Sequence, residues 1–318
     1  MIDARGPLNQ TGIARAFDMN VRALSVFDQV AIVDHTELAG ETLFVQTNGV
    51  GMETIAKDVT NFLASPRRIA YYVWETLNIP IGDLIALGHY TEIWTASRYC
   101  QQALEIGGFD SRMIPHAVER YSYNGNPEQV FKFLMMFDPD SRIKRKNPFL
   151  ALQAFKEAFG DRKDVQLTIK SRGLLEEQVR ELKDCAGDAN VKLLNHELLK
   201  EQMSHLLSDH DALISLHQSE GFGLAVLEAM AHGMRVIYTD YSAPSEFAVG
   251  YPVEFDLKPS EDPFYASAMV AYPRLGSAVE QMKNALADGD VIRWKAFQKS
   301  LEYNFASLIG NVGNALHK

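Results

Sequence analysis

The sequence predicts an α/β protein built from two doubly wound, parallel-sheet domains. The chain has 318 residues, more than one hydrophobic core usually organises and enough for two. From about residue 12 onward, apolar runs typical of strands alternate with amphipathic stretches typical of helices. A concentration of turn-forming residues at 121–129 divides this alternation into two halves.

The first half, residues 1–125, is expected to form one compact sheet with covering helices. The predicted strands are 30–33, 43–46, 69–74 and 92–96, and the predicted helices lie near 13–25, 54–64 and 97–107. A strand before residue 12 is barely visible in Met1–Pro7. A truncated or divergent first strand is therefore one interpretation of this domain.

The second half, residues 126–290, repeats the pattern. Its predicted strands are 130–137, 165–170, 191–194, 212–216 and 235–239, each next to a helical segment. In the remaining part, 291–318, apolar residues recur at near-helical spacing over 291–308 and predict a helix that packs on the protein. The pattern does not decide which domain it covers; packing back on the first domain is one arrangement.

Composition excludes several classes of function. The formal net charge is −10, which argues against sequence-independent binding of nucleic acid. Cys100 and Cys185 are too few for a disulfide framework, so a reducing cytoplasm is expected. No apolar run reaches the roughly 18 to 20 residues of a membrane helix, which leaves at most peripheral membrane association.

The sharpest local pattern runs from Ala212 to Tyr238. It predicts a strand, a tight glycine loop, a short helix that stops at Gly233, and a second strand. In a parallel sheet, ligands bind outside the carboxyl ends of the strands, where this loop must lie. Gly221 and Gly223 permit a close approach of the backbone, and the following helix favours a phosphate or sugar oxygen at its N-terminus.

Glu228 is the unusual residue of the short helix. It shares a helical stripe with Leu224, Leu227 and Ala231. Burial of an unpaired carboxylate costs several kcal/mol, so Glu228 is expected to receive hydrogen bonds. A ligand hydroxyl and a salt bridge to a neighbouring strand are the two interpretations that the helix by itself allows.

These residues resemble a known family, the retaining glycosyltransferases of family four, which have the GT-B architecture. The hallmark of that family is a pair of glutamates separated by seven residues, and here Ser219–Leu224 and Glu228–Ala231 match its Ser-Glu-Gly-Phe-Gly-Leu and Glu-Ala-Met-Ala letter for letter. The resemblance implies two Rossmann-like domains that face each other across a cleft. It extends over nearly the whole chain, strongly from about 130 to 250 and weakly before 65.

The resemblance implies roles for the residues of the motif. Glu220 would hold hydroxyls of the donor sugar, and Glu228 the ribose of the nucleotide. The backbone of Gly221, Phe222, Gly223 and Leu224 would then meet the sugar and the diphosphate.

A second match is Arg145-Lys-Asn-Pro148, which resembles the element that opens the first helix of the donor domain. Asn147 is a favourable N-cap and Pro148 a favourable first helical residue. The resemblance makes Lys146 a diphosphate ligand that stabilises the leaving nucleotide; a solvated basic turn is the alternative.

Many relatives also carry an arginine six residues earlier, where this chain has Asp140. Lys170, at a predicted strand end, is the expected substitute as second cation, followed by Arg142 and Arg145. The base of the nucleotide is expected near 171–174 and 194–198.

In the first domain, Gly12 occupies the place of a small glycine loop that admits donor and acceptor in the family. The segment around Trp74-Glu75 resembles one found in bacterial polysaccharide transferases, which favours GDP-mannose over a UDP-sugar. There Trp74 would stack on an acceptor sugar and Glu75 would bind its hydroxyl, unless they are a core tryptophan and a capping glutamate. His116 falls at the interdomain position of the family and is expected to be structural.

The sequence thus predicts a hexosyltransferase that uses a nucleotide sugar and a glycan or lipid-linked acceptor, with no cofactor and no metal. The pairs Asp138/Asp140, Asp209/Asp211 and Asp288/Asp290 imitate an Asp-x-Asp metal motif but are not interpreted as metal sites. A catalytically silent sugar-nucleotide binder and a sugar-nucleotide epimerase of the same architecture are the alternative functions.

Overall fold

The computed structural model describes residues 1–7, 12–33, 40–46, 62, 65–119, 121, 130–139 and 142–317. The chain divides into two compact units. Unit 1 comprises Met1–Glu119, Glu220–Phe222 and Tyr303–Lys318, and unit 2 comprises Arg120–Ser219 and Gly223–Glu302. The predicted helix at 54–64 lies almost entirely outside the described residues, as do most of the predicted linker at 121–129 and the predicted boundary at 125/126.

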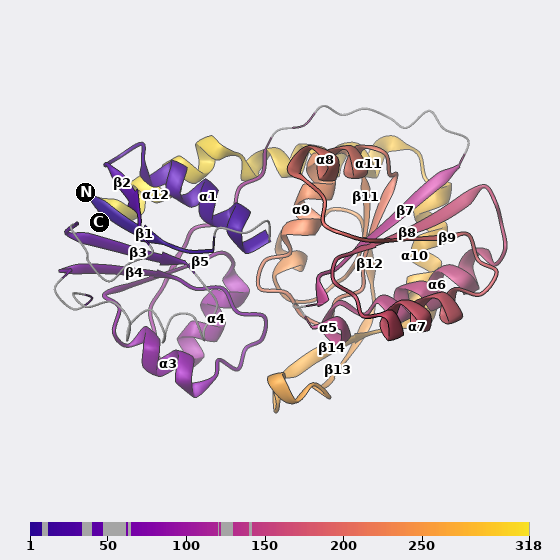
Figure 1. The fold of residues 1–318 in the computed structure, drawn as a ribbon, viewed down its shortest axis with the longest axis horizontal. Coiled ribbons are helices and arrows are strands. Elements are labelled where there is room, and N and C mark those ends of the chain that lie inside the picture. The colour runs from indigo at the N-terminus through magenta and orange to yellow at the C-terminus, as the bar shows by residue number, and fades with distance from the viewer. Residues whose placement is uncertain are drawn as a thin grey trace. The chain divides into compact units, whose positions relative to one another are not determined.

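Unit 1 is built on a parallel sheet. Within the described residues its six strands are ordered β2-β1-β3-β4-β5-β6 (Figure 1). They are β1 (Ile2–Arg5), β2 (Val30–Ile32), β3 (Thr42–Gln46), β4 (Arg67–Tyr71), β5 (Glu92–Thr95) and β6 (Arg112–Met113). The helices described in this part are α1 (Gly12–Leu24), α3 (Ile81–Leu87) and α4 (Arg98–Ile106). The ring of Phe44 packs against Tyr71 and Trp94 in the core, with centroids 6.2 and 5.9 Å apart.

Strand β1 lies in the segment where the sequence showed a strand only weakly. It pairs in parallel with β2 on one side and β3 on the other, and Ile2, Asp3 and Ala4 are all buried. The carboxylate of Asp3 accepts a hydrogen bond from the Gly40 amide at 2.8 Å. The apolar periodicity of the sequence indicates this strand only weakly, because the strand is short and contains the charged Asp3. The hydrogen bond from Gly40, which is distant in sequence, compensates for the burial of this carboxylate.

Unit 2 contains a second parallel sheet, ordered β12-β11-β10-β7-β8-β9 in the described part of the chain. Its strands are β7 (Phe131–Met136), β8 (Val165–Ser171), β9 (Val191–Asn195), β10 (Ala212–Ser215), β11 (Arg235–Thr239) and β12 (Tyr251–Val253). The helices are α5 (Ile143–Lys146), α6 (Pro148–Phe159), α7 (Glu176–Ala186), α8 (Lys200–Ser208), α9 (Leu224–Ala231), α10 (Leu275–Ala287) and α11 (Asp290–Ser300). These two sheets with flanking helices confirm the predicted doubly wound α/β fold.

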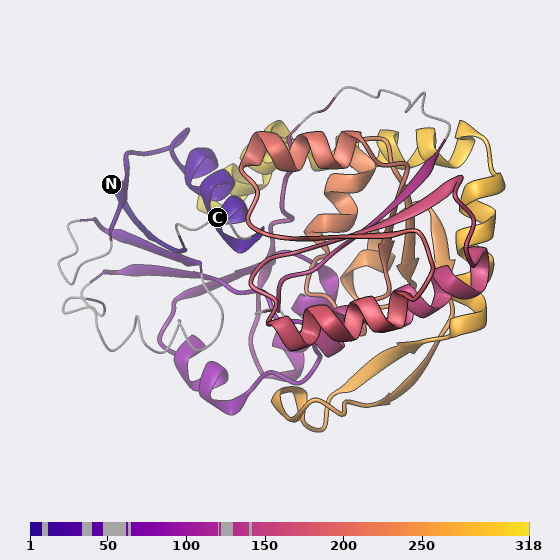
Figure 2. The same ribbon diagram turned by 45° about the vertical axis from the view of Figure 1, so that its right-hand side comes forward.

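An antiparallel pair of strands, β13 (Phe255–Pro259) and β14 (Met269–Pro273), projects from unit 2 and was not predicted (Figure 2). A backbone hydrogen bond of 2.9 Å from the Ala271 amide to the Gln218 carbonyl connects it to the segment that follows β10. The side chain of Arg142 lies over the ring of Phe264 near the end of this hairpin, 4.0 Å from its centroid.

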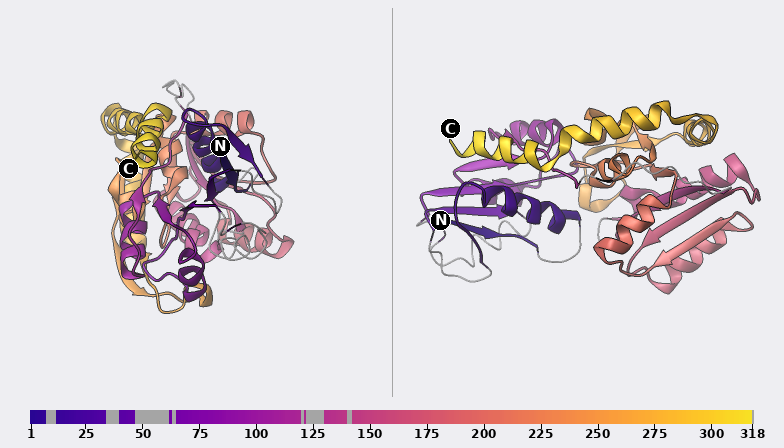
Figure 3. Two further views of the ribbon diagram at one scale, coloured as in Figure 1. Left: turned by 90° about the vertical axis from the view of Figure 1, so that its left-hand side faces the viewer. Right: turned by 90° about the horizontal axis from the view of Figure 1, so that it is seen from above.

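The C-terminal segment also differs from the prediction, which was a single helix over 291–308. Helix α11 ends at Ser300 and contacts α9 in unit 2, whereas α12 (Phe305–Leu316) belongs to unit 1 and contacts α1 (Figure 3). Asn304 separates them, because its side chain accepts a hydrogen bond from the Ser307 amide at 3.0 Å and so starts a new helix. The apolar spacing continues across this break, which is why periodicity did not reveal it.

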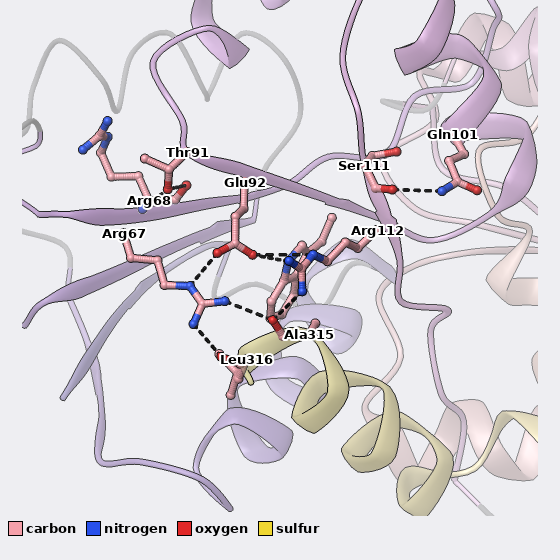
Figure 4. A network of polar contacts seen from close by, with 10 residues as sticks. Arg67, Arg68, Thr91, Glu92, Gln101, Ser111, Arg112, Ala315 and Leu316 are labelled. Carbon is pink, nitrogen blue, oxygen red and sulfur yellow. Dashed lines mark hydrogen bonds and ion pairs between the residues drawn. The ribbon is translucent and has the colours of Figure 1, made fainter. Parts of the chain in front are cut away.

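The last carbonyls of α12 are bound by arginines from the sheet of unit 1 (Figure 4). The Arg67 guanidinium donates to the carbonyls of Leu316 at 2.9 Å and Ala315 at 3.0 Å, and Arg112 donates to Ala315 at 2.7 Å. Glu92 accepts from Arg67 Nε at 2.6 Å. The guanidinium groups therefore satisfy carbonyls that have no partner within the helix and neutralise the negative end of its dipole.

We expect Arg67→Met to lower the free energy of unfolding by about 2 to 3 kcal/mol, because it removes hydrogen bonds made by a charged donor. Urea unfolding of the purified variant measures this. Arg162→Met is the control, since the pair of Arg162 with Asp164 is solvent-exposed and should add little stability. Equal midpoints for the two variants would show that the arginine does not hold α12.

Candidate functional site

The site is built first on the carboxyl edge of the sheet in unit 2. Strand order reverses between β7 and β10, since the chain moves from β7 to β8 and β9 on one side and from β10 to β11 and β12 on the other. Ligands of open α/β sheets bind at such a switch point. The segments that leave it are 137–147 after β7 and 216–223 after β10. They contain some of the predicted site residues, namely Arg145, Lys146 and Glu220–Gly223.

Arg145 joins these two segments. Its backbone carbonyl accepts from the Gln218 amide at 2.8 Å, and its Nη1 donates to the Ser219 carbonyl at 2.9 Å. The side chain is 4% exposed. Arg145 thus connects the two segments at the switch point. Its contact with the diphosphate is still a prediction.

Lys146 ends the short helix α5 and is half-buried, directly before the helix that begins at Pro148. Pro148 as first helical residue is confirmed. Asn147 occupies the N-cap position, as predicted, but its backbone is left-handed, with φ 58°, and its side chain makes no capping hydrogen bond. Asparagine tolerates this conformation better than most residues, so it serves the turn between two helices.

Helix α9 begins and ends at glycines. Gly223 precedes it with φ 90°, and an added Cβ would lie 2.7 Å from Cγ of Pro244. At the other end Gly233 has φ 70°, and the amides of Gly233 and Met234 donate to the carbonyls of Met230 and Ala229. This pattern confirms the predicted C-terminal glycine stop. Glu228, on α9, is half-buried.

The segment Glu220–Phe222 belongs to unit 1, although the residues on either side belong to unit 2. The Gly221 carbonyl accepts from Ser97 Oγ at 2.7 Å and from Cys100 Sγ at 3.1 Å. An added Cβ at Gly221 would lie 2.5 Å from Val73 Cγ1 and 2.8 Å from the Trp74 carbonyl. The residue is therefore glycine because the backbone of unit 1 is this close.

Phe222 is buried against the ring of His116, with centroids 4.8 Å apart, and its ring lies 6.2 Å from that of Tyr303. Glu220, two residues earlier, is 8% exposed. The side chain of Phe222 therefore anchors the segment within unit 1. The predicted contact of Phe222 with the donor is made by its backbone.

His116 is held in a defined tautomer. Tyr71 donates its hydroxyl hydrogen to the Ile114 carbonyl at 2.5 Å, so the 3.0 Å contact of this hydroxyl with His116 requires Nδ1 of the histidine to be the donor. Burial lowers the pKa of His116 to about 4. A neutral imidazole locked in this way matches the expected structural role.

Trp74 and Glu75 follow strand β4. Trp74 is 5% exposed, its Nε1 donates to Thr76 Oγ1 and to the Asn78 carbonyl, each at 2.9 Å, and its ring is stacked with that of Tyr72. This burial does not favour stacking on an acceptor sugar, so the acceptor role stays a prediction. Glu75 is half-buried beside it.

Lys170 joins the two segments expected to hold the base. Its Nζ donates to the carbonyls of Ser171 at 2.7 Å and His196 at 2.6 Å. Burial, followed by the charge of Arg172, lowers the pKa of Lys170. Asn195 adds to this connection, because its side-chain amide exchanges hydrogen bonds with the backbone of Leu174. Two donors of the ammonium are thus already used, and binding of a diphosphate by Lys170 remains a prediction.

The remaining predicted residues lie as follows. Gly12 is the first residue of α1, while the preceding residues 8–11 lie outside the described part of the chain. Asp138 pairs with Arg172 at 2.7 Å, and Asp140 is outside the described residues. Among the residues described, no cluster of three or more His, Cys, Asp or Glu side chains could hold a metal ion. None of the helices in the described ranges has the length and apolar composition that a membrane span requires.

Sequence reasoning missed Ser97 and Cys100. Their signal is positional: Ser97 follows a buried strand of a parallel sheet and caps the next helix, so its hydroxyl lies at the edge where ligands bind. Which loop it contacts could not be inferred, because Gly221 is 124 residues away in the chain.

The comparisons with known proteins agree with this geometry. Residues 139–251 match the model of a family described as glycosyl transferases group 1. The solved structure of Anabaena HepE in complex with UDP and glucose is similar over 99% of both chains, with 12% identity and a TM-score of 0.74. The fold is therefore GT-B. No curated protein matches the sequence.

Other solved structures are longer. The chain covers 54% of S. aureus TarM, crystallised as a mutant with fondaparinux, α-GlcNAc-glycerol and UDP, at 15% identity and a TM-score of 0.64 over 86% of this chain. It covers 80% of a UDP-forming α,α-trehalose-phosphate synthase from Burkholderia xenovorans, at 12% identity and a TM-score of 0.65 over 98% of this chain. At such identities the likeness establishes the fold alone.

We expect Gly221→Ala to destabilise the protein by about 1 to 3 kcal/mol, because the new methyl group overlaps Val73 and the Trp74 carbonyl. Gly310→Ala is the matched control: Gly310 lies in α12, where an added Cβ meets open space, so this change should stabilise by about 0.5 to 1 kcal/mol. Thermal unfolding of both variants measures the difference. A Gly221→Ala protein as stable as the wild type would contradict the close approach.

The neutral His116 predicts a pH dependence of stability. Its pKa is about 4 in the folded protein against an ordinary 6.5, so between these values the unfolded chain binds the additional proton. Stability should fall by roughly 3 kcal/mol as the pH decreases through this window, and His116→Gln should lose correspondingly less. Burial also lowers the pKa of His210 and of His232. Because both histidines are still present in His116→Gln, this variant should keep part of the pH dependence.

The measurement is urea unfolding of wild type and His116→Gln at about pH 7 and about pH 4.5. Exposed His317→Gln is the control, which should follow the wild type. The same loss of stability in His116→Gln as in the wild type would show that His116 is not the responsible group.

Proposed function

We propose that the protein is a retaining glycosyltransferase that moves a hexose from a nucleoside diphosphate sugar to a hydroxyl group of an acceptor. The observation that carries the proposal is the pair Glu220 and Glu228 around a glycine loop at the sheet switch point, within a segment that matches the glycosyl transferases group 1 model. A glycan or lipid-linked oligosaccharide as acceptor, and a cytoplasmic location, are parts of the proposal.

The roles of the residues are those that the resemblance to the retaining glycosyltransferases of family four implies. Glu228 would bind the ribose of the nucleotide and Glu220 the hydroxyls of the donor sugar. Lys146 would stabilise the charge that develops on the diphosphate as the bond to the sugar breaks. The departing diphosphate oxygen would take the proton of the acceptor hydroxyl while the new glycosidic bond forms on the same face. Catalysis is then mainly positioning and charge stabilisation, with no metal required.

The identity of the donor rests on two opposing indications. The Trp74–Glu75 segment favours GDP-mannose by resemblance, whereas several similar structures were solved with UDP or a UDP-sugar. We choose UDP-glucose as the first donor to test and GDP-mannose as the second.

A catalytically silent nucleotide-sugar binder is the second candidate function. It is favoured by Asp140 in place of the arginine of the family and by the two carbonyl contacts of Lys170. Such a protein would bind a donor without releasing its nucleoside diphosphate. An epimerase of the same fold would instead convert the donor without any acceptor.

The deciding experiment is a thermal-shift and calorimetric screen of the purified protein against UDP, GDP, ADP and dTDP and their common sugar conjugates. Selective stabilisation by one nucleotide identifies the donor class. Release of nucleoside diphosphate from that donor then separates a transferase from a silent binder, and chromatography of the sugar separates both from an epimerase. Absence of binding across the panel would contradict the proposal.

Two substitutions test the assigned roles. Glu228→Gln should weaken binding of the selected nucleoside diphosphate by roughly tenfold or more, because it removes a charged hydrogen-bond acceptor. Lys146→Met should lower kcat by about a hundredfold or more with little loss of nucleotide affinity. Calorimetry and diphosphate release give the two quantities.

The matched controls are Lys144→Met, an exposed lysine of the same helix α5, and Glu181→Gln, an exposed glutamate of α7. Both should bind and turn over like the wild type. If Lys146→Met and Glu228→Gln behave like these controls at normal stability, the site assignment is wrong.

A further inference from the structure

The Gly221 carbonyl is held by the first turn of α4 in unit 1. Ser97 Oγ donates to it at 2.7 Å and Cys100 Sγ lies 3.1 Å from it. Ser97 is 2% exposed and Cys100 1% exposed, so water does not compete for these contacts. This carbonyl belongs to the residue that directly follows Glu220.

The hydroxyl of Ser97 is fixed by a second bond. It accepts from the Cys100 amide at 3.1 Å, as the N-cap of α4, while it donates to Gly221. A hydroxyl has one hydrogen and two lone pairs, so both bonds form together and determine its orientation. A buried hydrogen bond between fixed partners resists displacement of the carbonyl more strongly than an exposed one would.

Cys100 supports the same carbonyl. Its sulfur lies 3.1 Å from the Trp74 carbonyl and 3.1 Å from that of Gly221, so the thiol hydrogen is directed at backbone oxygens. Burial raises the pKa of the Cys100 thiol to about 11, which keeps it protonated as a donor.

Two peptide groups near Glu220 are held by side chains. The Ser219 carbonyl, directly before Glu220, accepts from Arg145, and the Gly221 carbonyl, in the peptide group one residue further along, accepts from Ser97. The absence of a side chain at Gly221 allows the close contact with Val73 and Trp74 that sets this position. The direction in which the Glu220 carboxylate leaves the backbone depends on these peptide orientations.

We propose that Ser97 is a positioning residue for Glu220: its hydroxyl, supported by the Cys100 thiol, orients the Gly221 peptide so that the carboxylate can bind the donor sugar. This inference rests on the proposed function. It assigns binding of the donor sugar to contacts made in unit 1, whereas binding of the nucleoside diphosphate is assigned to Glu228, which belongs to unit 2.

The test separates the sugar from the nucleotide. The donor selected by the nucleotide screen is used to measure kcat of nucleoside diphosphate release, and calorimetry gives the Kd of the nucleoside diphosphate alone. Ser97→Ala should lower kcat between roughly tenfold and a hundredfold through misplacement of Glu220, with the Kd of the nucleoside diphosphate changed less than about twofold. Ser97→Thr, which retains a donor and an N-cap, should restore most of the lost turnover.

Two further variants keep the test decisive if a Ser97 variant folds poorly. Cys100→Ala removes the thiol donor and should lower kcat severalfold, and Cys100→Ser, which replaces it by a hydroxyl, should recover it. Asn304→Ala is the control for loss of a helix cap, since Asn304 caps α12 in the same way that Ser97 caps α4. It should reduce stability without changing kcat.

The inference is overturned if Ser97→Ala and Cys100→Ala turn over like the wild type, or if they weaken nucleoside diphosphate binding and turnover to the same extent. The proposed function fails in a different way: the wild type itself would then bind no nucleotide or release none from its sugar conjugate, and the role of Ser97 would fall with it.

Discussion

The site depends on how closely the backbone at Gly221 approaches the backbone at Trp74. A carbonyl that lies 2.8 Å from the position of a Cβ leaves no space for a side chain, and the glycine in turn places its own carbonyl within reach of Ser97 and Cys100. The segment Glu220–Phe222 is therefore part of unit 1, while the strand before it and the helix after it belong to unit 2. Gly221 thus belongs to unit 1, whereas Gly223 belongs to unit 2.

The sheet of unit 2 has side-chain contacts of its own between the loops that follow its strands. Its order places the ends of β7 and β10 next to each other, where the Arg145 side chain and backbone hold the two following segments together. The ends of β8 and β9 are joined separately by Lys170 and Asn195. If one of these loops moved away, a buried donor would lose its acceptor, and an unpaired buried donor is costly in free energy. These hydrogen bonds therefore make the loops rigid, as positioning of a substrate requires.

Several residues at the site have structural tasks that limit how freely they can serve a ligand. Arg145 and Lys170 donate to backbone carbonyls, and Trp74 is buried with its Nε1 hydrogen bonded. These contacts give each of the three side chains a role in holding the backbone around it.

By itself, the sequence determined the features that local physics controls. The alternation of apolar runs and amphipathic stretches identified the parallel α/β class, Pro148 marked the start of α6, and Gly233 marked the end of α9, because strand burial, a fixed φ and a left-handed turn each have a local signature. The spacing of Glu220 and Glu228 around the glycines indicated the candidate site through its resemblance to a family motif.

Only the tertiary structure decided which partner each segment has. The buried Asp3 of strand β1 found its hydrogen-bond donor at Gly40, the C-terminal segment formed two helices of which the second starts after Asn304, and the Gly221 carbonyl received a hydrogen bond from Ser97. The partners in the first and last of these contacts are 37 and 124 residues apart in the chain. Periodicity and propensity describe neighbours in sequence, so they carry no information about pairings that arise only when distant segments pack together.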